Sequence, residues 1–376
     1  MKKSLFIIAA TALVVGCASN DIKNDIVGNE MPIGFSRIYI EKGTKAFASG
    51  AYTTVNFKNE GNTFGVFGYK NATSNDVKVF GERTGETEGV KVTFGTDWTY
   101  SPLRYWDKAA TSYNFYAYAP HSDNFTGTVA LGSNSGNAFS ISGFKQATTQ
   151  PAMIDLMTDL TSRATVNSTS TKPLGENDVE FTFTHILSNI NILMNVSGDL
   201  KADATQNPVI VNSVSIGAIK MDGEYGYDNG YKWSLTDPQT TAPTTFTATK
   251  AQESNTAVFG SNELKASGQN SASTISPDDI GTNSVPGLTD LLFVPQDVDA
   301  SYAITVQYKI ANEVFDKTIL LSEFKKKVNN VDTPLSTWEP GNLYNYVLTI
   351  GPTPILFDIK EISGWGDGGT YTYVIP

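Results

Sequence analysis

The feature of this sequence that most restricts its fold is a regular alternation of apolar and polar side chains. Residues 301–310, SYAITVQYKI, carry apolar or aromatic side chains at every second position, and residues 342–350, NLYNYVLTI, repeat the pattern. Successive side chains of a strand point to opposite faces of its sheet, so this spacing predicts strands with one buried face. Stretches with the spacing of an amphipathic helix are almost absent. We therefore expect an all-β protein.

The aromatic and glycine content supports the same fold class. The chain has 17 Tyr and 20 Phe, which favour strands, and 32 Gly, which suit the turns between them. About 340 residues remain after the N-terminal leader described below, which is enough for two domains of ordinary size. Clusters of Gly, Asn and Asp separate the alternating segments. This arrangement predicts tandem β-sandwiches.

A change of composition marks the expected domain boundary. Residues 161–178 are polar and rich in turn-forming residues, whereas residues 179–196 are strongly apolar. We therefore expect one domain in residues 33–170 and another in residues 171–376. Within the apolar stretch the buried face switches near Ser188, which predicts a bulge or a short bend there.

The first 17 residues have the form of an export signal. Lys2 and Lys3 precede an apolar run at residues 5–15 that is too short to span a bilayer as a helix, and Gly16 and Cys17 follow. In a lipoprotein signal, cleavage falls before the cysteine, and the cysteine then carries the acyl chains. Gly16 and Cys17 match that cleavage site. The alternative is a secretory signal that has an incidental cysteine.

Loss of the signal peptide makes an acidic protein more acidic. Removal of residues 1–16 takes away Lys2 and Lys3, so the formal charge changes from −11 to −11 − 2 = −13. Residues 17–32 are polar and acidic, and we expect them to tether the lipidated Cys17 to the folded part.

Charge and cysteine content limit the partners. An acidic surface repels nucleic acid and anionic lipid, so we expect no nucleic-acid partner, and the lipid on Cys17 is the one expected contact with the outer membrane. Cys17 is the only cysteine, which excludes an internal disulfide bond. The expected location is the outer membrane or the cell surface.

Catalytic side chains are scarce. The two histidines, His121 and His185, are too few for a zinc site or for Cys/His catalysis. His185 is in phase with apolar residues of its strand and is predicted to be a core or sheet-edge histidine, whereas His121 is expected in a turn. Asp155 and Asp159 are expected in a solvated loop. We therefore predict no catalytic residues, no metal site and no cofactor.

An aromatic segment, WTYSPLRYW at residues 98–106, allows two interpretations. Trp98, Tyr100, Tyr105 and Trp106 can form a platform on which a sugar stacks. They can also close one end of a sandwich, which is the interpretation that we favour.

Seven segments together resemble a known family. In order along the chain they are DWTYSPLRYWD at 97–107, YNFYAYAP at 113–120, IDLMTD at 154–159, FTFTHILSNINILMNV at 181–196, LLFVPQ at 291–296, WEPGNLYNYVLTI at 338–350 and ILFDIKEISGW at 355–365. They resemble the fimbrillin family, the lipoprotein subunits of type V pili in gut and oral Bacteroidales. The resemblance implies two transthyretin-like β-sandwich domains and a role in pilus assembly without enzymatic activity.

The resemblance also implies assembly by strand exchange. The subunits of this family resemble a sandwich that is exported with a temporary first strand, which is replaced by a strand of another subunit. The corresponding segment here is PIGFSRIYIEKGTKAF at 32–47. Its expected strand residues are Ile33, Phe35, Ile38 and Ile40.

The resemblance further implies that release of that strand needs a cut by a trypsin-like surface protease. Lys45 follows a glycine-containing loop and is the expected processing site. The family usually has arginine there, and the nearest arginine in this chain, Arg37, lies inside the expected strand. Arg37 is therefore the alternative site.

The end of the sequence provides a candidate donor strand. Residues 366–376, GDGGTYTYVIP, combine a glycine-rich lead with Tyr371, Tyr373 and Ile375 on one face. The alternative is an ordinary last strand in its own sheet.

These observations lead to one expected function and one alternative. We expect a stalk subunit of a cell-surface pilus that supports adhesion, with other copies or related subunits as partners. The alternative is a surface glycan-binding lipoprotein that stays on its membrane anchor.

Overall fold

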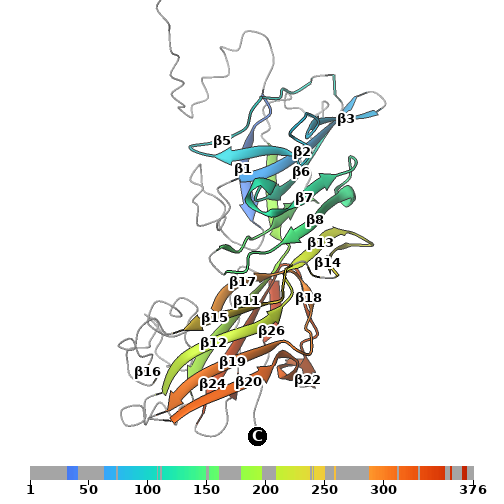
Figure 1. Ribbon diagram of the computed structural model, residues 1–376. Coiled ribbons are helices and arrows are strands. Elements are labelled where there is room, and N and C mark those ends of the chain that lie inside the picture. Colours follow the sequence, from blue (N-terminus) through green and yellow to red (C-terminus); the bar gives the residue numbers. More distant parts are fainter. Residues whose placement is uncertain are drawn as a thin grey trace, which may run out of the picture.

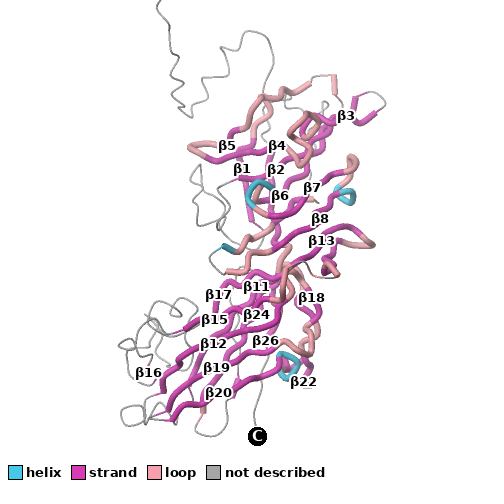
Figure 2. The backbone as a smooth tube through the Cα atoms, viewed as in Figure 1, coloured by secondary structure: helices cyan, strands magenta, loops and turns pink. Residues whose placement is uncertain are grey.

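The computed structural model describes the chain in sixteen stretches. They are residues 32–40, 63–72, 75–107, 109–110, 112–149, 152–160, 179–196, 209–237, 239, 241–249, 258–259, 288–310, 313–328, 331–351, 356–357 and 366–370. Within these stretches the regular secondary structure is strand apart from short 3₁₀ turns, which include Ser122–Asn124, Gly136–Ala138 and Leu321–Glu323 (Figure 2). The expected all-β fold is confirmed. In the described part of the chain, no helix is long and apolar enough to cross a membrane.

The strands form two layered units, which we call the upper and the lower sandwich after their places in Figure 1. The larger sheet of the upper sandwich has eight strands in the order β1-β10-β9-β6-β2-β4-β5, with β3 paired to β2. The strands are β1 (Phe35–Ile40), β2 (Thr63–Ala72), β3 (Asn75–Phe80), β4 (Val90–Phe94), β5 (Trp98–Thr99), β6 (Ser112–Ala119), β9 (Met157–Asp159) and β10 (Val179–His185).

The smaller sheet of the upper sandwich has the order β14-β13-β8-β7. Its strands are β7 (Thr126–Leu131), β8 (Phe139–Lys145), β13 (Asp222–Tyr227) and β14 (Tyr231–Leu235). The alternation of β6 lets the larger sheet bury both faces, because Tyr118 packs against Phe139 of the smaller sheet whereas Phe115 belongs to a second core.

That second core lies inside a curl of the larger sheet. The edge strands β1 and β5 approach each other, although they are the two ends of the strand order. Apolar side chains of β1, β2, β4, β6 and β10 are buried between them. Strand β1 therefore helps to close the curled sheet.

The lower sandwich consists of two five-stranded sheets. One has the order β17-β11-β24-β25 with β26 paired to β24, and the other has the order β15-β12-β19-β20 with β16 paired to β12. The first contains β11 (Ser188–Val196), β17 (Leu288–Phe293), β24 (Asn342–Ile350), β25 (Leu356–Phe357) and β26 (Gly366–Thr370), and the second contains β12 (Val209–Ile219), β15 (Thr244–Thr249), β16 (Val258–Phe259), β19 (Ala303–Ile310) and β20 (Glu313–Leu320).

Two further strand pairs flank these sheets. They are β18 (Gln296–Asp297) with β23 (Thr337–Trp338), and β21 (Lys325–Val328) with β22 (Val331–Pro334). The two alternating segments of the sequence become β19 and β24, and their apolar sides are buried: Ile304, Val306 and Tyr308 in β19, and Tyr344, Tyr346, Leu348 and Ile350 in β24. The expected strands with one buried face are confirmed there.

Strands from the second half of the chain complete the upper sandwich. Strand β10 pairs with β1 and β9, and the β13–β14 hairpin pairs with β8. The bend expected near Ser188 is the crossing from β10 in the upper sandwich to β11 in the lower one. Residue 170, the expected boundary, lies outside the described residues. Strands that follow it in the sequence, β10, β13 and β14, belong to the same sheets as strands that precede it.

Candidate functional site: the groove that holds the first strand

Among the described strands, β1 lies at one edge of the larger upper sheet and pairs with β10 alone. The two strands are parallel, with Phe35 opposite Val179 and Ile38 opposite Phe181. Phe35 and Ile38 are three positions apart on β1, whereas their partners are two positions apart on β10, so a bulge is present in β1.

The apolar side chains of this segment fill a groove, which is formed by the curled sheet. Ile33, Phe35 and Ile38 are only 1%, 5% and 2% exposed, and Ile40 is half-buried. At about 25 cal/mol per Å² of apolar surface, such burial contributes several kcal/mol to the attachment of the segment. The groove therefore holds β1 by its side chains as well as by its backbone.

The ring of Phe35 lies among five other rings, which we call the ring socket. Its centroid is 5.8 Å from those of Phe64, Phe80 and Phe181, 5.6 Å from that of Tyr100 and 6.4 Å from that of Phe115. Four contacts are edge-to-face and the contact with Phe181 is stacked. Such geometries add to the free energy of burial.

A second set of contacts fixes the start of the strand through its backbone. The N–H of Ile33 donates to the carbonyl oxygen of Arg104 at 2.8 Å, and the Tyr100 hydroxyl donates to the carbonyl oxygen of Ile33 at 2.8 Å. The carbonyl oxygen of Gly34 accepts from the N–H of Val179 at 3.0 Å. We call these three hydrogen bonds the backbone clamp.

A buried ion pair holds the clamp in position. Nη2 of Arg104 contacts both carboxylate oxygens of Glu86, at 2.6 and 2.7 Å, and the two side chains are 7% and 13% exposed. Nε of the same arginine donates to the carbonyl oxygen of Val79 at 3.0 Å. Burial raises the pKa of Tyr100, so its phenol stays protonated and can donate at neutral pH.

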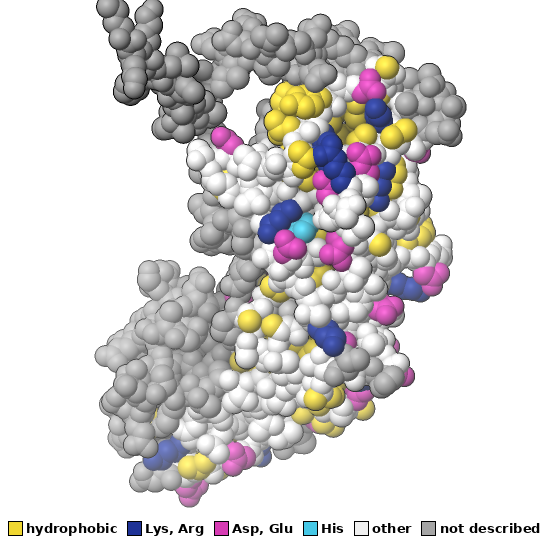
Figure 3. All heavy atoms as spheres, turned by 45° about the horizontal axis from the view of Figure 1, so that its top comes forward, with side chains coloured by type: hydrophobic (Ala, Val, Ile, Leu, Met, Phe, Trp, Pro, Cys, Tyr) yellow, Lys and Arg dark blue, Asp and Glu magenta, His cyan; other side chains and the backbone are white. Residues whose placement is uncertain are grey.

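The aromatic segment at residues 98–106 mainly completes the upper core. Trp106 is buried, and its ring centroid lies 4.8 Å from that of Tyr113. The ring centroid of Trp98 lies 4.7 Å from that of Phe64. Tyr105 is exposed, and Figure 3 shows hydrophobic side chains gathered at this end of the molecule. The packing interpretation of the segment agrees with these contacts. Sequence reasoning missed the roles of Tyr100 and Arg104 in the clamp.

Several predicted site residues lie outside the described part of the chain. They are Gly16, Cys17, Lys45, Tyr371, Tyr373 and Ile375. Arg37 is described through its backbone, which lies opposite Glu180 in the pairing of β1 with β10. The start of the expected donor segment, residues 366–370, forms β26 and pairs in parallel with β24 of the same chain.

The histidines and their acidic neighbours form structural contacts. Nδ1 of His185 lies 2.9 Å from Oδ1 of Asp155, and both side chains are nearly buried. His121 caps a 3₁₀ turn by accepting from the N–H of Asp123, and burial lowers its pKa. Among the described residues, no group of three His, Cys, Asp or Glu side chains can hold a metal ion.

The expectation of a solvated loop at Asp155 and Asp159 was wrong. The two residues are 8% and 2% exposed. Asp159 ends β9, and its Oδ2 accepts from the N–H of Thr182 at 2.7 Å. The cost of burying these carboxylates is compensated by hydrogen bonds to neighbouring segments. Those partners cannot be recognised from the polarity of the surrounding sequence.

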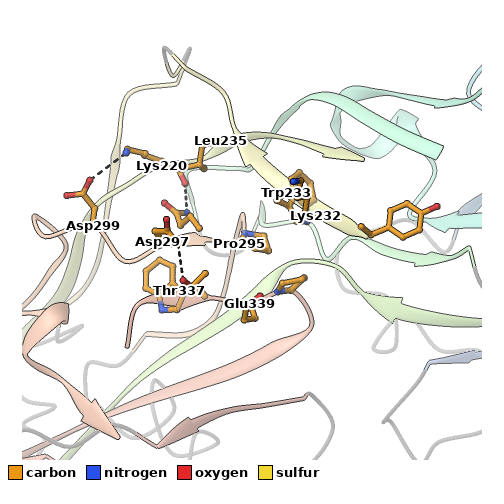
Figure 4. Close-up of a pocket in the computed structure, with 13 residues that line it drawn as sticks. Lys220, Lys232, Trp233, Leu235, Pro295, Asp297, Asp299, Thr337 and Glu339 are labelled. Carbon is orange, nitrogen blue, oxygen red and sulfur yellow. Dashed lines mark hydrogen bonds and ion pairs between the residues drawn. The ribbon is translucent and has the colours of Figure 1, made fainter. Parts of the chain in front are cut away.

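A pocket of about 530 Å³ lies between the β13–β14 hairpin and the β18–β23 pair (Figure 4). Its two tryptophans are buried, and their ring nitrogens donate within the protein: Trp233 to the carbonyl oxygen of Ile186 and Trp338 to the hydroxyl of Tyr346. A glycan site would need an exposed indole face. Neither tryptophan offers one.

Comparisons with known proteins agree with the fold. A crystal structure of a fimbrial protein from Bacteroides vulgatus is 20% identical, with 90% of this chain and 99% of that chain covered and a TM-score of 0.52. A protein from Bacteroides uniformis assigned to cell adhesion is 16% identical, with 90% and 98% covered and a TM-score of 0.46. No curated protein matches. The model of the fimbrillin-like family matches residues 49–365, and this chain therefore belongs to the fimbrillin-like family.

Proposed function

We propose that this chain is a stalk subunit of a cell-surface pilus and that it assembles when another subunit's strand replaces β1. Membership of the fimbrillin-like family supports a structural subunit of pilus type that serves adhesion. The observation that carries the finer proposal is the attachment of β1. Among the described strands it is an edge strand that pairs with β10 alone, and its apolar face is deeply buried.

Loss of β1 would leave an unstable groove. The N–H and C=O groups of β10 that face β1 would lose their partners, and the ring socket would lose its central ring. An extended strand from another molecule restores both the hydrogen bonds and the burial. Exchange of one strand for another therefore avoids the free-energy cost of an empty groove, whereas release without replacement does not.

The position of Arg37 supports Lys45 as the processing site. A cut after Arg37 would divide β1 and leave Ile38 and Ile40 on the protein side of the cut. A cut after Lys45 would free the whole strand. We propose that a trypsin-like protease cuts after Lys45 at the cell surface, where the precursor is anchored through the lipid on Cys17.

The donor is the end of the sequence. In Figure 1 β26 lies in the lower sandwich and β1 in the upper one. Six residues, 371–376, follow β26 in the sequence. A tail attached to the lower sandwich of one subunit and a groove in the upper sandwich of the next make a head-to-tail contact. Contacts of this kind produce filaments when the rotation between successive subunits does not close them into a ring.

The test compares the full chain with a variant that lacks residues 371–376, because this deletion leaves β26 in place. Both proteins are treated with limited trypsin, the cut is located by N-terminal sequencing, and oligomers are followed by gel filtration. We expect monomers before the cut, and growing oligomers only from the trimmed full chain. A trimmed full chain that stays monomeric, or a tailless variant that polymerises equally well, would contradict strand exchange.

A further inference from the structure

We propose that the ring socket selects the entering strand by a single aromatic ring, and that Tyr373 of a second copy supplies this ring. The inference rests on the strand exchange proposed above. It adds which residue of the tail enters which part of the groove, and in which register.

The backbone clamp cannot distinguish one sequence from another. Its three hydrogen bonds use the N–H and C=O of Ile33 and the C=O of Gly34. Any extended segment other than one with proline at the first of these positions can make the same bonds. Discrimination between strands must therefore come from the side-chain positions of the groove.

Among those positions, the one filled by Phe35 restricts most strongly the size and shape of the side chain that fits. Five rings with centroids 5.6 to 6.4 Å away surround it, and four of the five belong to phenylalanines. A small side chain here would leave a cavity the size of a ring, and close-packed cores relax only partly around such a cavity. An entering strand without a ring at this position would bind much more weakly.

The register of β10 then identifies the residue that enters. Phe35 lies opposite Val179 and Ile38 opposite Phe181, so the two positions are two residues apart on β10. On β1 they are three residues apart, because of the bulge. A regular strand without a bulge would fill the same two positions with side chains two residues apart.

The tail of the chain has this regular spacing. Tyr371, Tyr373 and Ile375 alternate with Thr372 and Val374 in the sequence. With Tyr373 in the ring socket, Ile375 takes the place of Ile38, and Tyr371 takes the place of Ile33. This is the one alignment that puts a ring in the socket and aliphatic side chains at Ile38's position without a new bulge.

The tail that enters the groove comes from a second copy of the chain, because within one chain the tail and the groove belong to different sandwiches. The tail follows β26, which is held against β24 in the lower sandwich, whereas the groove is in the upper sandwich (Figure 1). Residues 371–376 span at most about 20 Å when fully extended. Strands β8 and β13 are drawn at heights between β1 and β26 in the figure.

The test uses three variants of the full chain, each trimmed with trypsin as above. Tyr373→Ala should reduce the rate of oligomer formation at least about 100-fold, in line with the loss of a buried ring. Tyr373→Phe keeps the ring and should assemble at the rate of the unaltered chain. Thr372→Ala changes the other face of the tail and is the matched control, with no change expected. None of these substitutions alters a residue of the described core.

Two outcomes separate this inference from the proposal on which it rests. If the unaltered trimmed chain forms no oligomers, and a labelled peptide of residues 32–40 does not rebind to it, strand exchange itself is wrong. If the unaltered chain assembles and Tyr373→Ala assembles equally fast, strand exchange stands and the aromatic selection is overturned. Equal losses in Thr372→Ala and Tyr373→Ala would also overturn it, because only one of them faces the socket.

Discussion

At the scale of single residues, the upper sandwich depends on glycines that give aromatic rings their space. Gly65 of β2 lies opposite Tyr118 of β6, and a Cβ at Gly65 would overlap the ring of Tyr118. That ring cannot easily move away, because its hydroxyl donates to the carbonyl oxygen of Glu88 at 2.6 Å. The residue type at position 65 is thus decided by a neighbour on the adjacent strand.

We therefore expect Gly65→Ala to lower the free energy of unfolding by about 1–3 kcal/mol, the usual range for overpacking of a core. Gly226→Ala in β13 is the matched control, since nothing lies within 4 Å of the position of its added Cβ. Urea denaturation of both variants measures the difference. Equal stability of the two variants would show that the Tyr118 ring adapts to the extra methyl group.

At the scale of elements, the attachment of β1 combines a groove with a clamp. The side chains of Ile33 and Phe35 are buried in the groove, while the Tyr100 hydroxyl and the Arg104 carbonyl bind the backbone of Ile33. If the chain is cut after Lys45 as proposed, the strand is no longer covalently linked at one end, and these contacts alone delay its release.

Tyr100→Phe removes the hydroxyl and keeps the ring in the socket. A hydrogen bond contributes about 1 kcal/mol, so we expect the cut strand to leave about five-fold faster. Tyr105→Phe, an exposed tyrosine in the same segment, serves as the control and should not change the rate. Gel filtration of trimmed protein with a labelled N-terminal fragment measures the half-life of the complex. The same half-life in both variants would exclude a role for the hydroxyl in retention.

At the scale of the whole molecule, one continuous cluster of buried apolar residues extends through both sandwiches, and it contains tyrosines from each of them. Burial raises the pKa of Tyr231 in the upper sandwich and of Tyr302 beside the lower one to about 12, and it also raises the pKa of Tyr118 and Tyr225. Their neutral phenols are therefore part of the folded state. Alkaline pH acts on both sandwiches at once.

The sign of the pH dependence follows from these shifts. Between pH 10, where an exposed tyrosine ionises, and about pH 12, the unfolded chain loses protons that the folded chain keeps, so the free energy of unfolding falls as the pH rises. Below pH 10 this contribution is fully present. Urea midpoints measured from pH 9 to 12 should fall, and less steeply in Tyr302→Phe. A flat profile would contradict the buried phenols.

The predicted attachment to the membrane through Cys17 also concerns the whole molecule. Because Cys17 is the only cysteine, Cys17→Ala should abolish incorporation of labelled fatty acid and leave the protein out of the membrane fraction. Cys17→Ser is a closer match in size and should behave in the same way. Label that still enters either variant would show that the lipid is attached elsewhere, and unlabelled protein that stays in the membrane fraction would show that the lipid is not needed.

The sequence by itself determined that the described part of the chain is built from strands. Alternation in β19 and β24, and the apolar positions at Ile33, Phe35 and Ile38, can be recognised because each depends on side chains a few residues apart. The temporary nature of β1 and the processing at Lys45 stay predictions.

Only the tertiary structure decided which strands meet. The parallel pairing of β1 with β10, the β13–β14 hairpin beside β8 and the burial of Asp159 all depend on partners distant in the sequence. The clamp residues Tyr100 and Arg104 were missed for the same reason, since their partners Ile33 and Glu86 belong to other segments. Periodicity specifies which face of a strand is buried, but the choice of neighbour comes from complementary packing and hydrogen bonds that form only when the chain is folded.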